Sequence, residues 1–330
     1  MTHRIDIALG IDIGGTNTKI GLVDSEGDII QKTSLPTSSE NLSHSFLNEL
    51  GNEIDGLLDS NEELVLKGIG VGAPMANSQT GSVQNAANLN WEGNVNLREA
   101  LQDRYQVPVL INNDANLAAV GEMTFGGAIG MQDFITVTLG TGLGCGIVSN
   151  GELVQGPDSL AGEMGHITVR QGGRYCGCGR RGCLETYVSA SGIRRTVYKL
   201  IGDRNDGKSI LAQIPFEEIS SEVIYNAAKD GDKIALEAFQ HTGEILGLQL
   251  ANLVVITNPR AIFLVGGLAN AKEMIFEPTR RSMEAHLLES SKGTVEILPS
   301  KLNDNNVPIL GASAQVWESL AHLTDDTLIA

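Results

Sequence analysis

The sequence predicts an α/β protein made of two similar domains. Its 330 residues are roughly twice the length of one ordinary domain. Apolar segments of strand length alternate with segments of helical periodicity. The N-terminal hairpin pattern also returns at an offset of 125 residues, where Gly15-Thr16 falls on Gly140-Thr141 and Gly21 on Gly146. A supersecondary unit that occurs twice in one chain indicates two related halves.

Each element follows from hydrophobic period and turn chemistry. In the first half, Gly14-Gly15 separates two apolar strands, and Phe46, Leu50 and Ile54 share one helical face. The segments predicted for this half are strands over 5–13, 16–23 and 28–35, a helix over 41–58, a strand over 64–71, a helix over 96–104, a strand over 107–112 and a helix over 114–123.

In the second half, Asn150-Gly151 is a strong hairpin turn. The segments predicted there are strands over 134–140 and 144–149, mainly helices over 184–256, strands over 261–265 and 294–298, and a helix over 309–322. We expect a smaller N-terminal domain over 1–115 that is completed by the C-terminal residues 309–330. A larger domain over 116–308 then carries a zinc-binding loop over 166–183.

Composition excludes several classes of protein. The chain has 23 Lys and Arg against 40 Asp and Glu, and its net charge of −17 repels nucleic acid. No apolar run reaches the roughly 18–20 residues that span a bilayer, so we expect no membrane partner. Residues 1–10 lack the pattern of a secretory signal, and we therefore expect a cytoplasmic protein.

Two glycine-rich turns favour phosphate binding. Paired glycines let backbone N–H groups approach an anion closely, although a plain hairpin turn is the alternative for the first turn. Asp12 before that turn is placed to hold Mg²⁺ through water. A strand follows the second turn, where a dinucleotide fold would have a helix, so the two turns together predict hairpins that grip one triphosphate. The residues concerned are Asp12, Gly14, Gly15, Thr16, Asn17 and Lys19 in the first hairpin, and Gly140, Thr141, Gly142 and Gly144 in the second.

A third glycine pair, Gly266-Gly267, follows the strand over 261–265 and precedes a helix. Such a turn can admit a flat base or a ribose close to the backbone. An ordinary strand-to-helix turn explains the same residues equally well.

Three of the four cysteines lie within eight residues, in the spacing C-x-C-x4-C. Cys176, Cys178 and Cys183 supply three thiolates, and His166 is the nearby histidine that completes a tetrahedral zinc site. A closed shell of four protein ligands predicts structural zinc. Three unrelated thiols would leave the glycines of this loop unexplained.

Polar residues cluster at two further places. Asn113-Asp114 follows an apolar strand, where a helix cap and a catalytic carboxylate are both open interpretations. Glu163 and Glu185 flank the cysteine loop and, with His166, suit the hydroxyl groups of a sugar; solvated surface charges are the alternative. We expect the cysteine loop to orient these two glutamates but not the phosphate hairpins.

Taken together, these motifs resemble the ROK family of bacterial sugar kinases and sugar-responsive repressors, and look most like its glucokinases. The specific part is Glu163-x-Gly-His166 followed by Cys176-x-Cys178-Gly-x-x-Gly-Cys183-x-Glu185, and Asn88-Leu-x-Trp91 looks like the glucokinase branch. The resemblance implies an actin-like ATPase (ribonuclease H-like) fold, with ATP and sugar bound between two α/β domains. Met75 departs from the pattern, since many members have glycine after Pro74.

The resemblance also implies a role for each motif. Asp114 becomes the catalytic base, Asp12–Lys19 and Thr138–Gly146 become phosphate loops, and Gly266 and Gly267 become the adenosine loop. The implied sugar-binding residues are Gly72, Asn88, Asn113, Asp114, Glu163, His166 and Glu185. The implied cofactors are ATP with Mg²⁺ and one structural Zn²⁺ per chain, and the implied assembly is a homodimer or homotetramer.

Two alternatives to a glucose kinase stay open. One is a kinase for N-acetylglucosamine, N-acetylmannosamine or mannose within the same family. The other is a non-catalytic sugar-responsive regulator. The family's repressors carry a helix-turn-helix domain ahead of the kinase-like part, and we expect none here because only residues 1–4 precede the first predicted strand.

Overall fold

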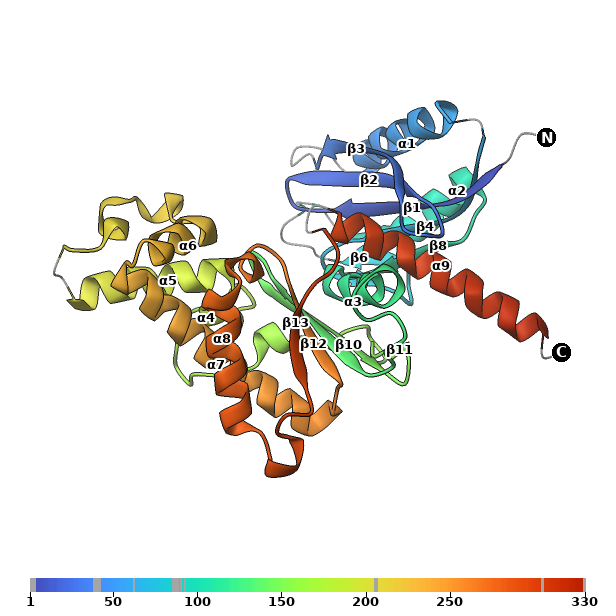
Figure 1. The fold of residues 1–330 in the computed structure, drawn as a ribbon. Coiled ribbons are helices and arrows are strands. Elements are labelled where there is room, and N and C mark those ends of the chain that lie inside the picture. The colour runs from blue at the N-terminus through green and yellow to red at the C-terminus, as the bar shows by residue number, and fades with distance from the viewer. Residues whose placement is uncertain are drawn as a thin grey trace. The chain divides into compact units, whose positions relative to one another are not determined.

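The structure is a computed structural model that describes residues 4–37, 43–61, 63–84, 89, 91, 93–204, 207–303 and 306–328. The chain divides into two compact units. The first unit comprises Met1–Gly130, Gln155–Ala161 and Lys301–Ala330, and the second comprises Met131–Val154 and Gly162–Ser300. Each unit has its own sheet and its own helices (Figure 1).

The first unit contains a five-stranded sheet in the order β3-β2-β1-β4-β8. Its strands are β1 (Ile5–Ile13), β2 (Asn17–Val23), β3 (Ile29–Pro36), β4 (Leu64–Gly72) and β8 (Val109–Asn112). The first three strands form antiparallel hairpins, and β4 and β8 continue the sheet in parallel with β1. These bounds confirm the strands predicted from the sequence.

The helices of the first unit are α1 (Ser43–Asp59), α2 (Leu97–Tyr105), α3 (Asp114–Phe125) and α9 (Val307–Leu328). Phe46, Leu50 and Ile54 of α1 are fully buried, as their shared face predicts. Glycines allow α9 to lie directly on the sheet: a Cβ at Gly10 would be 2.3 Å from the Ile309 oxygen, and one at Gly70 only 1.7 Å from the Ala312 oxygen.

A small sheet in the first unit was not predicted. It consists of β5 (Ala76–Asn77), β6 (Ser82–Gln84) and β7 (Asn94–Asn96). Strands of two or three residues are too short to show an alternating pattern, so sequence periodicity does not reveal them.

The second unit repeats the topology of the first, with a sheet in the order β11-β10-β9-β12-β13. Its strands are β9 (Phe134–Leu139), β10 (Leu143–Ser149), β11 (Glu152–Leu153), β12 (Ala261–Val265) and β13 (Glu296–Pro299). The hairpin β9–β10 corresponds to β1–β2, which confirms the internal repeat. The turns differ in length: four residues separate the paired Ile13 and Thr18, whereas three separate the paired Leu139 and Leu143.

Helices make up most of the second unit. The α-helices are α4 (Glu185–Val188), α5 (Ala190–Arg204), α6 (Ser221–Lys229), α7 (Lys233–Thr257) and α8 (Glu273–His286), and the 3₁₀ turns are η1 (Met164–His166), η2 (Ile210–Gln213), η3 (Phe216–Glu218), η4 (Ala269–Ala271) and η5 (Glu289–Ser291). The long helix α7 packs closely on α8, since a Cβ at Gly247 would be 2.3 Å from the Thr279 oxygen. Among the described residues, no helix is both long and apolar enough to cross a membrane.

The division between the units falls after Gly130, whereas the sequence suggested residue 115. The reason is that α3 packs against α9, and a Cβ at Gly311 would be 2.3 Å from the Leu117 oxygen. Gln155–Ala161 also belongs to the first unit, where the Ser78 hydroxyl donates to Gln155 Oε1 at 2.5 Å.

Candidate functional site

The ends of three adjacent strands bring polar residues together in the first unit. Asp12 of β1 is the register partner of Gly72 in β4, and Gly72 is the partner of Asn112 in β8. Asp114 follows two residues later, at the start of α3. A Cβ at Gly72 would be 2.8 Å from Leu117 Cδ1, so a side chain there would have to displace Leu117, and it would also contact Asp12 Oδ1 at 3.8 Å.

The two carboxyl groups at this edge share an unusual electrostatic environment. The pKa of Asp12 is raised to about 6: desolvation by burial raises it most, the charge of Asp114 also raises it, and the charge of Lys19 lowers it. Desolvation also raises the pKa of Asp114, against a hydrogen bond that Ala115 N–H donates to Asp114 Oδ1 at 2.9 Å. Asp114 nevertheless stays accessible to solvent. Paired carboxylates that disfavour ionisation are a setting for a divalent cation or a transferred proton.

The helix-cap interpretation applies to Asn113 rather than to Asp114. Asn113 is the N-cap of α3, and its side chain accepts a hydrogen bond from Asn116 N–H at 2.7 Å. The sequence did not predict the hydrogen bonds that hold this cap in place. Asn112 Oδ1 accepts one from buried Asn116 Nδ2 at 2.9 Å and one from Asn113 N–H at 3.0 Å. A run of Asn residues after a strand is the only signal that the sequence offers for this network.

The first glycine turn forms an exposed tip between β1 and β2. Gly14 N–H donates to Asn17 oxygen at 3.1 Å and closes the turn, and Thr37 N–H donates to Thr16 oxygen at 2.8 Å. Gly15, Thr16 and Asn17 are exposed at the tip. Lys19 lies opposite Asp12 in the β1–β2 register, which explains its effect on the pKa of Asp12.

The second and third glycine segments lie side by side in the second unit. Both follow parallel neighbouring strands, β9 and β12. Leu268 N–H donates to the Leu139 oxygen at 3.1 Å, and Gly140 N–H donates to Gly142 oxygen at 3.1 Å. Gly266 has a φ of 98° and would place a Cβ 3.0 Å from the Leu139 oxygen, so this position requires glycine. Gly144 N–H donates to Thr138 Oγ1, while Thr141 and Gly267 are exposed.

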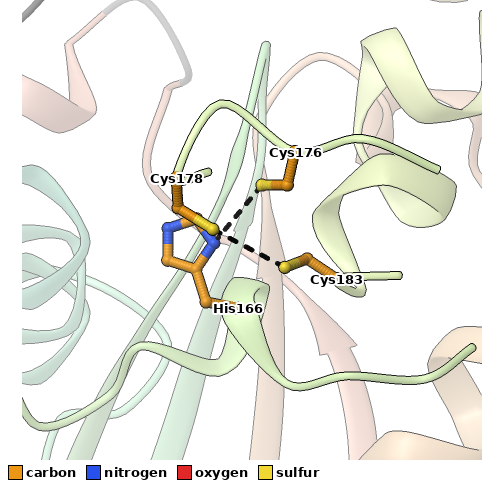
Figure 2. A group of neighbouring side chains, drawn as sticks. All are labelled: His166, Cys176, Cys178 and Cys183. Carbon is orange, nitrogen blue, oxygen red and sulfur yellow. Dashed lines mark hydrogen bonds between the residues drawn. The ribbon is translucent and has the colours of Figure 1, made fainter. Parts of the chain in front are cut away.

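His166, Cys176, Cys178 and Cys183 come together in the second unit, as Figure 2 shows. Their ligand atoms all lie within 4.8 Å of one another. Cys178 Sγ is 3.7 Å from Cys183 Sγ, and Cys176 Sγ is 3.7 Å from His166 Nδ1. A zinc–sulfur bond of about 2.3 Å implies tetrahedral sulfur atoms about 3.8 Å apart. The distances among the four residues therefore fit a zinc ion. The same distances also suit hydrogen bonds among thiols and an imidazole.

Glu163 contacts this cluster from the outside. Its Oε2 is 3.8 Å from His166 Nε2, which leaves His166 Nδ1 directed toward the cysteines. A carboxylate beside the second ring nitrogen of a ligating histidine fixes the ring orientation. Burial raises the pKa of Cys176 to about 12, so this group is a thiol unless a metal displaces its proton.

Glu185 joins the cysteine cluster to the second glycine segment, contrary to the expectation that the two are separate. Glu185 Oε2 accepts a hydrogen bond from Leu143 N–H at 3.1 Å, and Glu185 Oε1 lies 3.7 Å from Cys176 Sγ. The expectation failed because a backbone amide leaves no trace in the sequence that would identify it as the partner of a distant carboxylate.

The structure describes only part of the glucokinase-like stretch Asn88-Leu-x-Trp91. Asn88 lies outside the described residues, while Trp91 is buried, with its ring centroid 5.2 Å from that of Phe46. Met75 has a φ of 55°, in the left-handed region that glycine adopts freely. This backbone conformation explains why glycine would suit the position.

Comparison with known proteins identifies the family. The model of the ROK family matches residues 8–318. The chain belongs to the ROK family. It is 34% identical to a glucokinase of Halalkalibacterium halodurans, over 85% of this chain and 86% of that protein. It is 30% identical to a xylose repressor of Bacillus subtilis, over 94% of this chain and 76% of that protein.

A solved ROK structure agrees with this assignment. The ROK family glucokinase from Streptomyces griseus, in complex with glucose and AMPPNP, aligns with a TM-score of 0.78 and 30% identity, over 94% of this chain and 98% of that chain. The two-domain actin-like ATPase fold that the sequence implied is thereby confirmed. These similarities support a ROK sugar kinase and leave its sugar open.

Proposed function

We propose that this ROK protein is an ATP-dependent hexose kinase that converts glucose to glucose 6-phosphate. The observation that carries the proposal is the pair Asp12 and Asp114 at one edge of the first sheet, where Asp12 lies near the end of β1 and Asp114 begins the helix that follows β8. A solvent-accessible carboxylate with a raised pKa is a better proton acceptor than an ordinary aspartate. Similarity to glucokinases over most of the chain adds independent support.

In this proposal Asp114 accepts the proton of the sugar 6-hydroxyl. The oxygen then forms a bond to the γ-phosphorus of ATP as the bond to the β-phosphate oxygen breaks, which releases ADP. Asp12 would hold Mg²⁺ through water, and the ion supplies charge neutralisation at the phosphates. Phosphoryl transfer requires alignment and charge stabilisation, and these residue types provide both.

The glycine segments provide the nucleotide side of the proposed site. Gly14, Gly15, Thr16, Asn17 and Lys19 lie in one hairpin, and Gly140, Thr141, Gly142 and Gly144 in the other. Exposed turn residues at both tips suit phosphate oxygens. The adjoining turn Gly266-Gly267, beside Leu139, suits adenosine.

The sugar side is assigned to residues around both polar clusters. They are Gly72, Asn88, Asn113, Asp114, Glu163, His166 and Glu185. His166, Cys176, Cys178 and Cys183 would hold a structural zinc ion, which fixes the two flanks that carry Glu163 and Glu185. A homodimer or homotetramer remains our expectation for the assembly.

A sugar-responsive regulator is the second candidate, because the chain is 30% identical to a xylose repressor. Binding of sugar without transfer of phosphate would characterise such a protein. The presence of Asp114 and of both glycine hairpins favours catalysis.

The test is a coupled assay of ADP release with glucose, mannose, N-acetylglucosamine and N-acetylmannosamine as acceptors. We expect the highest kcat/KM for glucose. A tenfold preference for an N-acetylated sugar would overturn the choice of glucose but keep the kinase. Failure of every sugar to stimulate ADP release, together with measurable sugar binding, would favour the regulator.

A further inference from the structure

The Glu185 carboxylate lies between the metal cluster (His166, Cys176, Cys178 and Cys183) and the second glycine loop (Gly140–Gly144). One oxygen accepts from Leu143 N–H at 3.1 Å, and the other lies 3.7 Å from Cys176 Sγ. Glu185 thus contacts a cluster residue and the phosphate hairpin with the same side chain. A hydrogen bond to a carboxylate is stronger than one between neutral groups.

The position of Glu185 is fixed by the chain that carries the last cysteine. Cys183 and Leu184 are fully buried. Leu184 N–H donates to the Ile167 oxygen at 2.9 Å, and the Thr186 hydroxyl donates to the Cys183 oxygen at 2.7 Å. Because this backbone is held so closely, a shift of Cys183 moves the Glu185 carboxylate with it.

The glycine loop is held by the residues on both sides of the cluster. Ala190 N–H donates to the Gly140 oxygen at 2.9 Å, and the Ser191 hydroxyl donates to the Thr141 oxygen at 3.1 Å. On the other side, a Cβ at Gly165 would be only 2.3 Å from the Leu143 oxygen. Gly165 immediately precedes His166, so Leu143 is enclosed by both flanks of the metal cluster.

Gly142 lies close to the Glu185 carboxylate. A Cβ at that position would lie 2.5 Å from Glu185 Oε2. A side chain at position 142 would therefore have to displace the Glu185 carboxylate from its present position.

We propose that Glu185 is a positioning residue that makes the conformation of the second glycine loop depend on metal in the cluster. The inference rests on the proposed function for the identity of the ligand at this loop, which is a nucleotide phosphate. It extends that function: loss of metal weakens nucleotide binding as well as sugar binding. By linkage, nucleotide binding also tightens metal binding by the same factor.

The experiment compares zinc-loaded and chelator-stripped protein in two measurements that need no turnover. Hydrogen exchange reports the Leu143 amide, and calorimetry reports the Kd for ADP with Mg²⁺. Stripping should speed exchange at Leu143 and weaken ADP binding by about tenfold, the effect of losing one charge-assisted hydrogen bond. Glu185→Ala should show both changes while zinc is bound, with little further effect of stripping.

Three variants sharpen the comparison. Glu152→Ala removes an exposed carboxylate of β11, in the same unit but outside the metal cluster, so its Leu143 exchange and ADP affinity should match the wild type. Glu185→Gln keeps an oxygen that can accept from Leu143 N–H and should restore protection of that amide. Gly142→Ala places a methyl group against Glu185 Oε2 and should speed exchange of the Leu143 amide with zinc content unchanged. Zinc content and circular dichroism of each variant establish that it is loaded and folded.

Unchanged Leu143 exchange after stripping would overturn the proposal, as would equal losses on stripping in wild type and Glu185→Ala. The exchange measurement needs no ligand, so it decides the role of Glu185 even if ADP fails to bind. Absence of ADP binding in the loaded wild type would instead count against the proposed function.

Discussion

Asp12 lies near the end of β1 and Asp114 follows β8 of the same sheet, and the charge of Asp114 raises the pKa of the Asp12 carboxyl group. Burial has the larger effect, and together they place the pKa of Asp12 near 6. The folded protein therefore binds the Asp12 proton more tightly than the unfolded chain, whose aspartates ionise near pH 3.8. Ionisation of Asp12 therefore destabilises the folded protein, at a site suited to a cation.

Replacement of Asp12 should remove this destabilisation and so change how the free energy of unfolding depends on pH. As pH rises through the interval from about 4 to 6, the ligand-free wild type should lose up to about 3 kcal/mol of stability through this group. Asp12→Asn cannot ionise, so it should be more stable than the wild type at pH 7.5 in the absence of Mg²⁺, and the advantage should shrink toward pH 4.5. Urea unfolding of both proteins at the two pH values measures this difference. An advantage that is equal at both pH values, or reversed at pH 7.5, would contradict the assignment.

The contact between α9 and the first sheet predicts a large effect at Gly70. Its Cβ would meet the Ala312 oxygen at 1.7 Å, so Gly70→Ala must push the helix away and should cost about 1–3 kcal/mol or more. Gly56 in α1 is the matched control, because a Cβ there meets nothing within 4 Å. Gly56→Ala should stabilise by up to about 1 kcal/mol through helix propensity. Thermal unfolding of the two variants should therefore shift in opposite directions, and equal shifts would refute this packing argument.

The metal cluster predicts a selective dependence on its cysteines. Purified protein should contain about one zinc per chain, the amount that one four-ligand site holds. Cys178→Ser should lower that content, whereas Cys145→Ala should leave it unchanged, because buried Cys145 lies outside the cluster. Metal analysis of the three proteins is the measurement. Active wild-type protein that contains no zinc would contradict a structural role for the metal.

The sequence predicted the parts of the fold whose physical cause is local. Apolar segments bounded by glycine turns located β1 and β9, and the helical face of Phe46, Leu50 and Ile54 located α1. The cysteine spacing identified a cluster that the structure does assemble. The internal repeat was also visible, because a hairpin with fixed glycines conserves its spacing within one chain.

What sequence could not predict depends on contacts between distant segments. The close approach of Gly70 to Ala312 joins residues far apart in the chain, and nothing in either segment identifies the other. The same holds for Glu185 and the Leu143 amide, since any backbone N–H is an equal candidate before the chain folds. Asn113 illustrates a third case, where cap and ligand interpretations predict the same residue and only the hydrogen bond to Asn116 N–H distinguishes the cap.

The proposed role of Asp114 as the general base of a hexose kinase is tested most directly by the kcat of Asp114→Asn with glucose and ATP. Asparagine can still accept the hydrogen bond from Ala115 N–H, and Asn113 still caps α3, so the thermal midpoint should not fall. A positioned base contributes about 10²–10⁴ in rate. We therefore expect kcat to fall by at least about a hundredfold, with ADP binding retained. A variant that keeps more than about a third of the wild-type kcat would contradict the claim, because Asp114 would then serve only the start of a helix.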